Sequence, residues 1–173
     1  LWNIHGASEL QILEFGDNTL YDPIPLPGMV ASELSISAGG SMLALTVEGP
    51  SKPPTVELVD PRTGEWEMVD RVPSTGPLSA EPTLETVTAR DGMRFTGWLF
   101  RPPEGTPTIG AMLFLHGGPE GQGRPGYNEF FPGLVDAGIC VFLPNVRGSG
   151  GFGRAFMHAD DRERRFAAID DVA

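Results

Sequence analysis

The feature that most constrains this chain is an apolar run that ends in a pair of glycines. Residues 109–115 contain no charged side chain, and a run of this length is typical of a strand buried on both faces of a sheet. It leads into the sequence His116-Gly117-Gly118-Pro119. Glycine allows a backbone to approach a ligand closely and to direct its N–H groups at one point. The pattern predicts a buried strand that ends in a loop suited to bind a negatively charged oxygen.

The composition limits the class of protein. With 173 residues, of which 40% are hydrophobic and 20% charged, the chain is long enough for one or two globular domains. Its net charge of −11 argues against nucleic acid or an anionic membrane as a partner. No apolar run has the length of a membrane span and no secretory leader opens the chain, so we expect a cytoplasmic protein. Because the first residue is Leu1 rather than Met, this expectation covers only the residues present.

Residues 1–78 have the pattern of an all-β region. Short alternating or apolar runs recur between turn-forming residues, and these runs cover residues 9–14, 42–47 and 55–59. The layout of residues 13–27 resembles that of residues 58–73, and the offset of about 45 residues matches the blade period of a β-propeller. A closed propeller needs about four blades or more. We therefore interpret residues 1–78 as the C-terminal blades of an incomplete β-propeller.

After a linker at residues 74–80, the pattern changes to that of an α/β domain. Asp91-Gly92 predicts a hairpin turn between strands at 84–89 and 94–100. The later elements are expected as a strand at 109–115, a helix at 129–137, a strand at 139–143 and a helix at 160–173. An antiparallel pair followed by this β-α-β-α succession is typical of an α/β sheet. Residues 79–173 are thus predicted to be the N-terminal part of an incomplete α/β domain.

A second glycine-rich loop follows the strand at 139–143 and raises two further candidates. Arg147 is expected to organise this loop by binding backbone carbonyls or a carboxylate, with substrate binding as the alternative for its fork-shaped donor. Ser149 is not expected to be a nucleophile, because Arg147 stands where a Gly-x-Ser-x-Gly turn requires glycine. In the first loop, His116 either donates to the bound oxygen, shapes the loop, or is a core histidine, and geometry must decide its role.

Both loops also match a dinucleotide-binding pattern. Residues 121–126 and 148–153 each fit Gly-x-Gly-x-x-Gly. In a dinucleotide-binding fold, this pattern opens at the end of a strand, and an acidic residue closes a second strand about 20 residues later. Here other residues intervene, and Asp170 and Asp171 fall in a helical pattern. We therefore expect no nucleotide cofactor. Residues 158–161 match no common metal-ligand spacing, so no metal is expected either.

Three motifs occur in order across residues 91–153. The first is Asp91-Gly92 with Gly97-Trp98-Leu99-Phe100-Arg101-Pro102, the second is His116-Gly117-Gly118-Pro119, and the third is Asn145-Val146-Arg147-Gly148-Ser149-Gly150-Gly151-Phe152-Gly153. Together they resemble the prolyl oligopeptidase family of serine peptidases, in its acylaminoacyl-peptidase and dipeptidyl-peptidase-like branch. Asp171-Val172 also fits the Asp-Val pair in the helix that precedes the nucleophile strand of that family.

This resemblance implies a β-propeller joined to a C-terminal α/β-hydrolase domain that hydrolyses short peptides by acyl transfer. It places the backbone N–H of Gly118 in the oxyanion hole, and His116 where other branches carry a tyrosine that donates to the oxyanion. The Ser-Asp-His triad would follow residue 173, so this segment supplies the oxyanion-hole loop (His116, Gly117 and Gly118) and no triad residue. Alone it is expected to be inactive, and to fold only with the remainder of its polypeptide or with a complementing chain.

Two rival interpretations of the function are carried forward. The first is a carboxylesterase-type α/β-hydrolase, because His-Gly-Gly loops also occur there, although the propeller-like first half speaks against it. The second is a non-enzymatic propeller interaction module whose hydrolase half is degenerate. Comparing the hydrolysis of acylated peptides with that of short-chain esters distinguishes a peptidase from the first rival, a carboxylesterase. A downstream Gly-x-Ser-x-Gly followed by Asp and His excludes the second.

Overall fold

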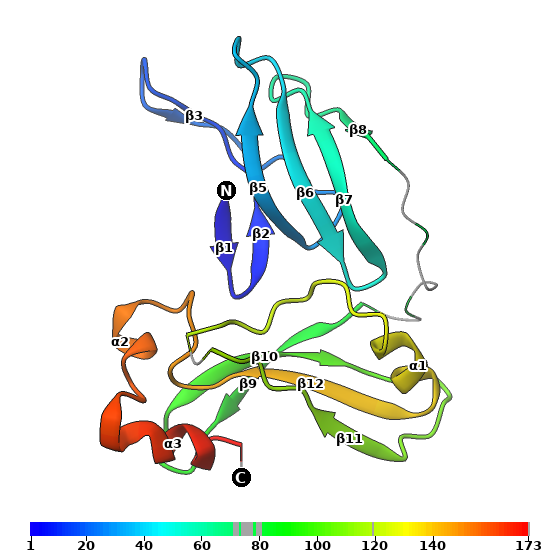
Figure 1. The fold of residues 1–173 in the computed structure, drawn as a ribbon, viewed down its shortest axis with the longest axis vertical. Helices are drawn as coiled ribbons and strands as arrows, with labels where there is room; N and C mark the ends of the chain where they lie inside the picture. The colour runs from blue at the N-terminus through cyan, green and yellow to red at the C-terminus, as the bar shows by residue number, and fades with distance from the viewer. Residues whose placement is uncertain (71–72, 74–77, 79–80, 119, 173) are drawn as a thin grey trace. The chain divides into compact units, whose positions relative to one another are not determined.

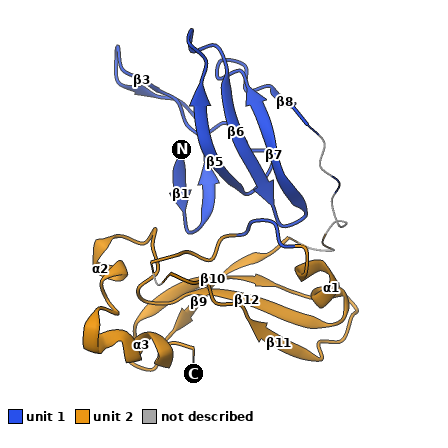
Figure 2. Cartoon of the chain, in the orientation of Figure 1, with its two compact units in different colours: residues 1–77, 125–128 blue, residues 78–124, 129–173 orange. Residues whose placement is uncertain are grey.

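A computed structural model describes residues 1–70, 73, 78, 81–118 and 120–172 (Figure 1). It divides into two compact units: residues 1–77 with 125–128, and residues 78–124 with 129–173 (Figure 2). The linker predicted at residues 74–80 lies outside the described residues, apart from Leu78. Within the part of the chain that is described, no helix has both the length and the apolar character needed to cross a membrane.

The first unit is built on a four-stranded antiparallel sheet in the order β5-β6-β7-β8 (Figure 1). Its strands are β5 (Val30–Ile36), β6 (Leu43–Gly49), β7 (Lys52–Val59) and β8 (Trp66–Met68). Two small hairpins precede it, formed by β1 (Trp2–Ile4) with β2 (Ala7–Glu9), and by β3 (Leu13–Glu14) with β4 (Thr19–Leu20). The strands predicted at 42–47 and 55–59 are confirmed, whereas β5 was not predicted.

The strand predicted at residues 9–14 is wrong as a continuous element. It is divided between β2 and β3, and Leu10 between them forms an isolated bridge to Ile24. The reason is packing, because Leu10 is buried in the core of the first unit. That core also contains alternate residues of β6, as period-2 burial requires. Its buried members are Leu10, Ala31, Leu43, Leu45, Val47 and Val59.

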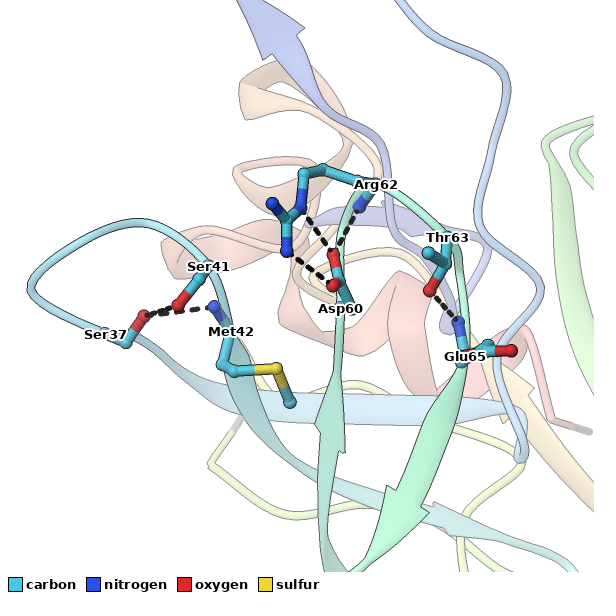
Figure 3. A network of polar contacts seen from close by, with 7 residues as sticks. All are labelled: Ser37, Ser41, Met42, Asp60, Arg62, Thr63 and Glu65. Carbon is cyan, nitrogen blue, oxygen red and sulfur yellow. Dashed lines mark hydrogen bonds and ion pairs between the residues drawn. The ribbon is translucent and has the colours of Figure 1, made fainter.

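Side chains close the turns between the strands of this sheet (Figure 3). In the β7–β8 turn, the carboxylate of Asp60 accepts the backbone N–H of Arg62 at 2.9 Å and its Nη2 at 2.8 Å. In the β5–β6 turn, Ser37 Oγ accepts the backbone N–H of Met42 at 3.0 Å. Short polar side chains that bond nearby backbone groups favour turns over continued strands. These contacts explain why the chain reverses at both places.

The second unit contains a mixed sheet in the order β11-β12-β10-β9. Its strands are β9 (Thr83–Thr88), β10 (Arg94–Phe100), β11 (Gly110–Leu113) and β12 (Ile139–Asn145). β10 pairs antiparallel with both β9 and β12, whereas β11 and β12 are parallel. The crossover between β11 and β12 contains helix α1 (Phe131–Asp136), with Pro132 in its first turn. The predicted hairpin and the predicted strand-helix-strand order are confirmed.

The helical part after β12 differs from the prediction of one helix at 160–173. Helix α2 (Arg154–Met157) was not predicted, and the later part consists of the 3₁₀ turn η1 (Arg162–Arg164) followed by α3 (Arg165–Asp170). The helical segment begins late because Arg162 has a φ of 57°, a left-handed conformation that an α-helix does not accommodate. Asp160, just before it, is buried.

The prediction that residues 109–115 are buried on both faces is wrong for the chain as described. β11 is an edge strand that pairs with β12 on one side. Ile109 is 74% exposed and Leu115 is 53% exposed. Phe114 packs edge-on against Phe131 of α1, with ring centroids 5.2 Å apart, but it remains partly exposed. An apolar sequence requires covering elements to become buried, and on this strand few are present.

Gly97 occupies a position on β10 where a side chain does not fit. A Cβ atom there would lie 2.5 Å from the ring of Phe142 and 2.7 Å from the carbonyl oxygen of Leu143. We expect Gly97→Ala to lower the free energy of unfolding by about 1–3 kcal/mol, because overpacking forces neighbouring groups to move. Urea denaturation measures this loss. Gly110→Ala is the matched control, because nothing lies within 4 Å of a Cβ at that position; equal losses for the two variants would rule out overpacking as the cause.

Candidate functional site

The loop after β11 carries the backbone donors that the sequence singled out. Gly117 and Gly118 are both exposed, and Gly118 has a φ of 85°, in the left-handed region that favours glycine. Among the described residues, neither the Gly117 N–H nor the Gly118 N–H has a hydrogen-bond acceptor. The loop therefore presents two adjacent amides that are not engaged by carbonyls of the described chain.

His116, which begins this loop, is engaged by the second glycine-rich loop. Its Nε2 lies 2.8 Å from Ser149 Oγ, and the Ser149 hydroxyl lies 2.7 Å from the carbonyl oxygen of Val146. The Nδ1 of His116 also lies 3.2 Å from the carbonyl oxygen of Gly117. Because both ring nitrogens contact groups of the protein itself, His116 holds the loop rather than offering a ring nitrogen to a ligand.

Two further contacts join the same pair of loops. The side chain of Asn145, fully buried at the end of β12, accepts the N–H of Gly123 at 2.7 Å and donates to the carbonyl of Gly123 at 3.0 Å. The backbone N–H of Gly150 donates to the carbonyl oxygen of Gly121 at 2.9 Å. The two loops are separate motifs in the sequence, and in the structure hydrogen bonds join them.

Arg147 lies at the base of the second loop and binds two carboxylates. Its side chain is only 7% exposed, and the Asp171 side chain is fully buried. Nε and Nη2 of Arg147 donate to Asp171 at 2.8 and 2.6 Å, and the Arg147 backbone N–H donates to the same carboxylate at 3.1 Å. Nη1 lies 2.7 Å from Asp91, at the β9–β10 hairpin. Arg147 thus connects the hairpin, the loop after β12 and the end of α3.

The charges in this cluster are mutually stabilised. Hydrogen bonding to Arg147, with a smaller contribution from the backbone N–H of Met93, lowers the pKa of Asp91 from its ordinary value of 3.8 to about 2. The pKa of Arg147 is raised, chiefly by its hydrogen bonds to Asp171 and Asp91. Because the pKa of Asp91 is depressed, its contribution to stability is present above pH 3.8 and is lost as the pH falls toward 2.

We expect Asp91→Asn to be less stable than the parent at neutral pH, and the difference to shrink as the pH falls from about 4 to about 2. In that range the Asp91 carboxyl of the parent becomes protonated, and it is then neutral like the asparagine of the variant. Because Asp91 is half exposed, added salt should reduce the difference as well. Thermal melts of the two proteins across this pH range test the expectation. A stability difference that stays constant down to pH 2 would contradict it.

A cavity of about 410 Å³ lies beside the joined loops. Its lining includes Leu115 and His116 from the loop after β11, Arg147 and Asp160 from the segment after β12, and Ile169 of α3. Gly117 and Gly118 do not line it. The structure therefore brings His116 and Arg147 to one cavity and leaves the two glycine amides outside it. Asn145, Asp91 and Asp171 also belong to this site, although the sequence assigned no binding role to them.

Comparisons with known proteins show which sequences and folds this chain resembles. The chain matches no family model. It is 28% identical over 155 residues to the uncharacterized peptidase YuxL of Bacillus subtilis, covering 87% of this chain and 23% of that protein. Its fold is similar to that of a puromycin-hydrolysing peptidase of Mycobacterium tuberculosis, with a TM-score of 0.73, 26% identity and coverage of 88% of this chain and 25% of that one.

A third comparison extends over nearly the whole chain. Prolyl oligopeptidase B from Galerina marginata, solved with a 25-residue macrocyclization substrate, matches with a TM-score of 0.79 at 17% identity, covering 98% of this chain and 24% of that one. At this identity the match concerns the fold alone. The chain thus spans about a quarter of the length of the relatives it matches.

In sequence and in fold, the chain resembles proteins of the peptidase class. Within that class, the resemblance to the prolyl oligopeptidase family, which three sequence motifs predicted, is confirmed.

Proposed function

We propose that the protein to which this chain contributes is a serine peptidase that hydrolyses short peptides by acyl transfer. In such a reaction a serine attacks the peptide carbonyl, a histidine transfers the proton, an aspartate orients the histidine, and backbone amides stabilise the oxyanion. This chain contributes the amides and no member of the triad. The observation that carries the proposal is the pair of adjacent N–H groups at the end of β11 that lack acceptors among the described residues.

The two compact units support a domain boundary at about residue 78. The four-stranded antiparallel sheet of β5 to β8 has the size and topology of one propeller blade. We propose that residues 1–78 are the C-terminal blades of a β-propeller and that residues 79–173 begin an α/β-hydrolase domain. The sheet order β11-β12-β10-β9, with its parallel pair at one edge, supports the second assignment.

The loop residues take different roles in this proposal. The N–H of Gly118 binds the developing oxyanion, and its neighbour Gly117 keeps the loop open to the substrate. His116 shapes the loop, because its Nε2 is hydrogen-bonded to Ser149 and its Nδ1 contacts the carbonyl of Gly117. Arg147 organises the adjoining loop through Asp171 and Asp91. No cofactor or metal is required, because serine acyl transfer uses side chains and backbone dipoles alone.

Exposed apolar residues on either side of β11 and in α3 support a further part of the proposal. Ile109, Leu115 and Phe166 are all more than half exposed, which is costly for side chains of this size. We propose that the remainder of the polypeptide, or a complementing chain, covers them. A short peptide is the proposed substrate, with neither nucleic acid nor membrane as partner, in the cytoplasm.

Hydrolysis assays on the whole protein test the proposed function. We expect cleavage of short chromogenic peptides, including N-acylated ones, and its abolition by a serine-directed phosphonate. Hydrolysis of short-chain esters with no cleavage of peptides would instead identify a carboxylesterase. Absence of both activities, together with no labelling by the phosphonate, would favour a non-enzymatic interaction module and overturn the proposal.

A further inference from the structure

We infer that Arg147 is a positioning residue that sets the geometry of the oxyanion-binding amides without touching the substrate, an inference that rests on the proposed function. It acts through the loop of residues 145–150, defined here as the support loop. The structural basis is a continuous series of hydrogen bonds from two buried or half-buried carboxylates to the loop that carries Gly117 and Gly118.

The first step is the anchoring of the support loop. Arg147 donates to Asp171 through its side chain and through its own backbone N–H, so both the guanidinium and the backbone of the loop are fixed to one carboxylate. Nη1 adds the contact with Asp91 at 2.7 Å. A planar guanidinium that binds carboxylates through several donors restricts orientation more strongly than a lysine ammonium does. The base of the support loop is therefore held from two directions.

The second step connects the support loop to the loop after β11. Asn145, Ser149 and Gly150 of the support loop each make a hydrogen bond to that loop, at Gly123, His116 and Gly121 respectively. These contacts lie on both sides of Gly117 and Gly118 in the sequence. Because the asparagine and the serine are fully buried, their bonds are protected from competition with water. Displacement of the support loop would therefore displace the two amides.

The third step concerns catalysis. Oxyanion donors act only when they lie about 2.7–3.1 Å from the position that the oxygen reaches in the transition state. Loss of the Arg147 anchor allows the support loop, and with it the amides, to shift from that position. The alternative of direct substrate binding is disfavoured, because the guanidinium is 7% exposed and is committed to two carboxylates. We therefore expect a loss of transition-state stabilisation, with the ground-state binding of the substrate unchanged.

The test compares Arg147→Met and Arg147→Lys in the whole protein, with every rate divided by the concentration of active sites that a serine-directed phosphonate titrates. For Arg147→Met we expect kcat to fall by about 10- to 100-fold, with KM changed by less than about twofold, because ground-state binding is untouched. Arg147→Lys keeps the positive charge but loses the fork-shaped set of donors of the guanidinium. Its kcat should therefore lie between those of the parent and of Arg147→Met.

A second readout separates positioning from a merely structural role. The affinity for a peptide trifluoromethyl ketone, which forms a tetrahedral adduct, should fall in parallel with kcat/KM, whereas the affinity for the product peptide should not change. Asp171→Asn in combination with Arg147→Met should cost little more than Arg147→Met alone, because both changes remove the same contact. Arg101→Met is the matched control, since Arg101 pairs with Glu85 at an exposed site of the same sheet.

The outcomes distinguish the inference from the function on which it rests. A parent protein without hydrolytic activity would overturn the proposed function. An active parent, with Arg147→Met showing an unchanged kcat per active site, would overturn the inference alone. The same follows if KM rises while kcat is unchanged, because that identifies a substrate contact. If Arg147→Met yields no folded protein, Arg147→Lys provides the test. An affinity of Arg147→Lys for the trifluoromethyl ketone equal to that of the parent would then reject the inference.

Discussion

Replacement of Gly118 by alanine in the whole protein is expected to lower kcat by about 10²- to 10³-fold, which is the usual cost of losing one oxyanion donor. At a φ of 85°, an L-residue is strained by about 1–2 kcal/mol. The peptide unit before residue 118 can relieve this strain by rotating, which turns the N–H away from the bound oxygen. KM should change little, because the donor acts mainly in the transition state.

Two controls isolate the donor from the strain. Gly105 has the same φ of 85° and, like Gly118, open space around a Cβ atom. Gly105→Ala should therefore show a similar loss of thermal stability with kcat retained. Gly117→Ala adds a methyl group into open space at a residue without a left-handed φ, and should cost far less activity than Gly118→Ala. If Gly118→Ala kept full activity while losing stability, the amide would have no role in catalysis.

The second large effect concerns the open edge of the second unit. The 173-residue chain prepared alone is expected to self-associate, because one edge of β11 pairs with no strand among the described residues and lies beside exposed apolar side chains. Leu113→Lys, at the end of β11, should shift the isolated chain toward monomer, because charge on an edge strand opposes pairing. The same substitution should destabilise the whole protein by roughly 4 kcal/mol, since the charge would then be buried without a partner.

Sedimentation velocity of the isolated chain and urea denaturation of the whole protein measure the two opposite effects. Thr88→Lys is the control, because Thr88 is exposed at the end of β9, on the opposite edge of the same sheet. It should leave the stability of the whole protein nearly unchanged. A cooperative, monomeric melt of the unmodified isolated chain would show that it needs no covering segment.

Local sequence signals predicted the strands and the first helix of the second unit, but not the helical segments after β12. The strand at 94–100 matches β10 residue for residue, and the Asp91-Gly92 turn lies where the hairpin forms. Burial could not be predicted in the same way. The run at 109–115 has the composition of a core strand, but its exposure depends on which elements lie beside it. Sequence periodicity reports the preference of a segment and does not report its neighbours.

The candidate site was predicted in part, for a related reason. The glycine pair and the arginine stood out because their residue types have unusual conformational freedom or donor geometry. The joining of the two loops, through Asn145 with Gly123 and Ser149 with His116, is a long-range arrangement without a local signal. The same holds for Asp91, which the sequence explains fully as a turn residue and which the structure pairs with Arg147.

A crystal structure of the whole protein, inhibited by a peptide trifluoromethyl ketone, tests the central claim most directly. We expect the oxygen of the tetrahedral adduct to lie about 2.7–3.1 Å from the backbone nitrogen of Gly118, with His116 still bonded to Ser149. An adduct oxygen that points away from this loop, or a Gly118 amide that is bonded to a carbonyl of the protein itself, would contradict the account.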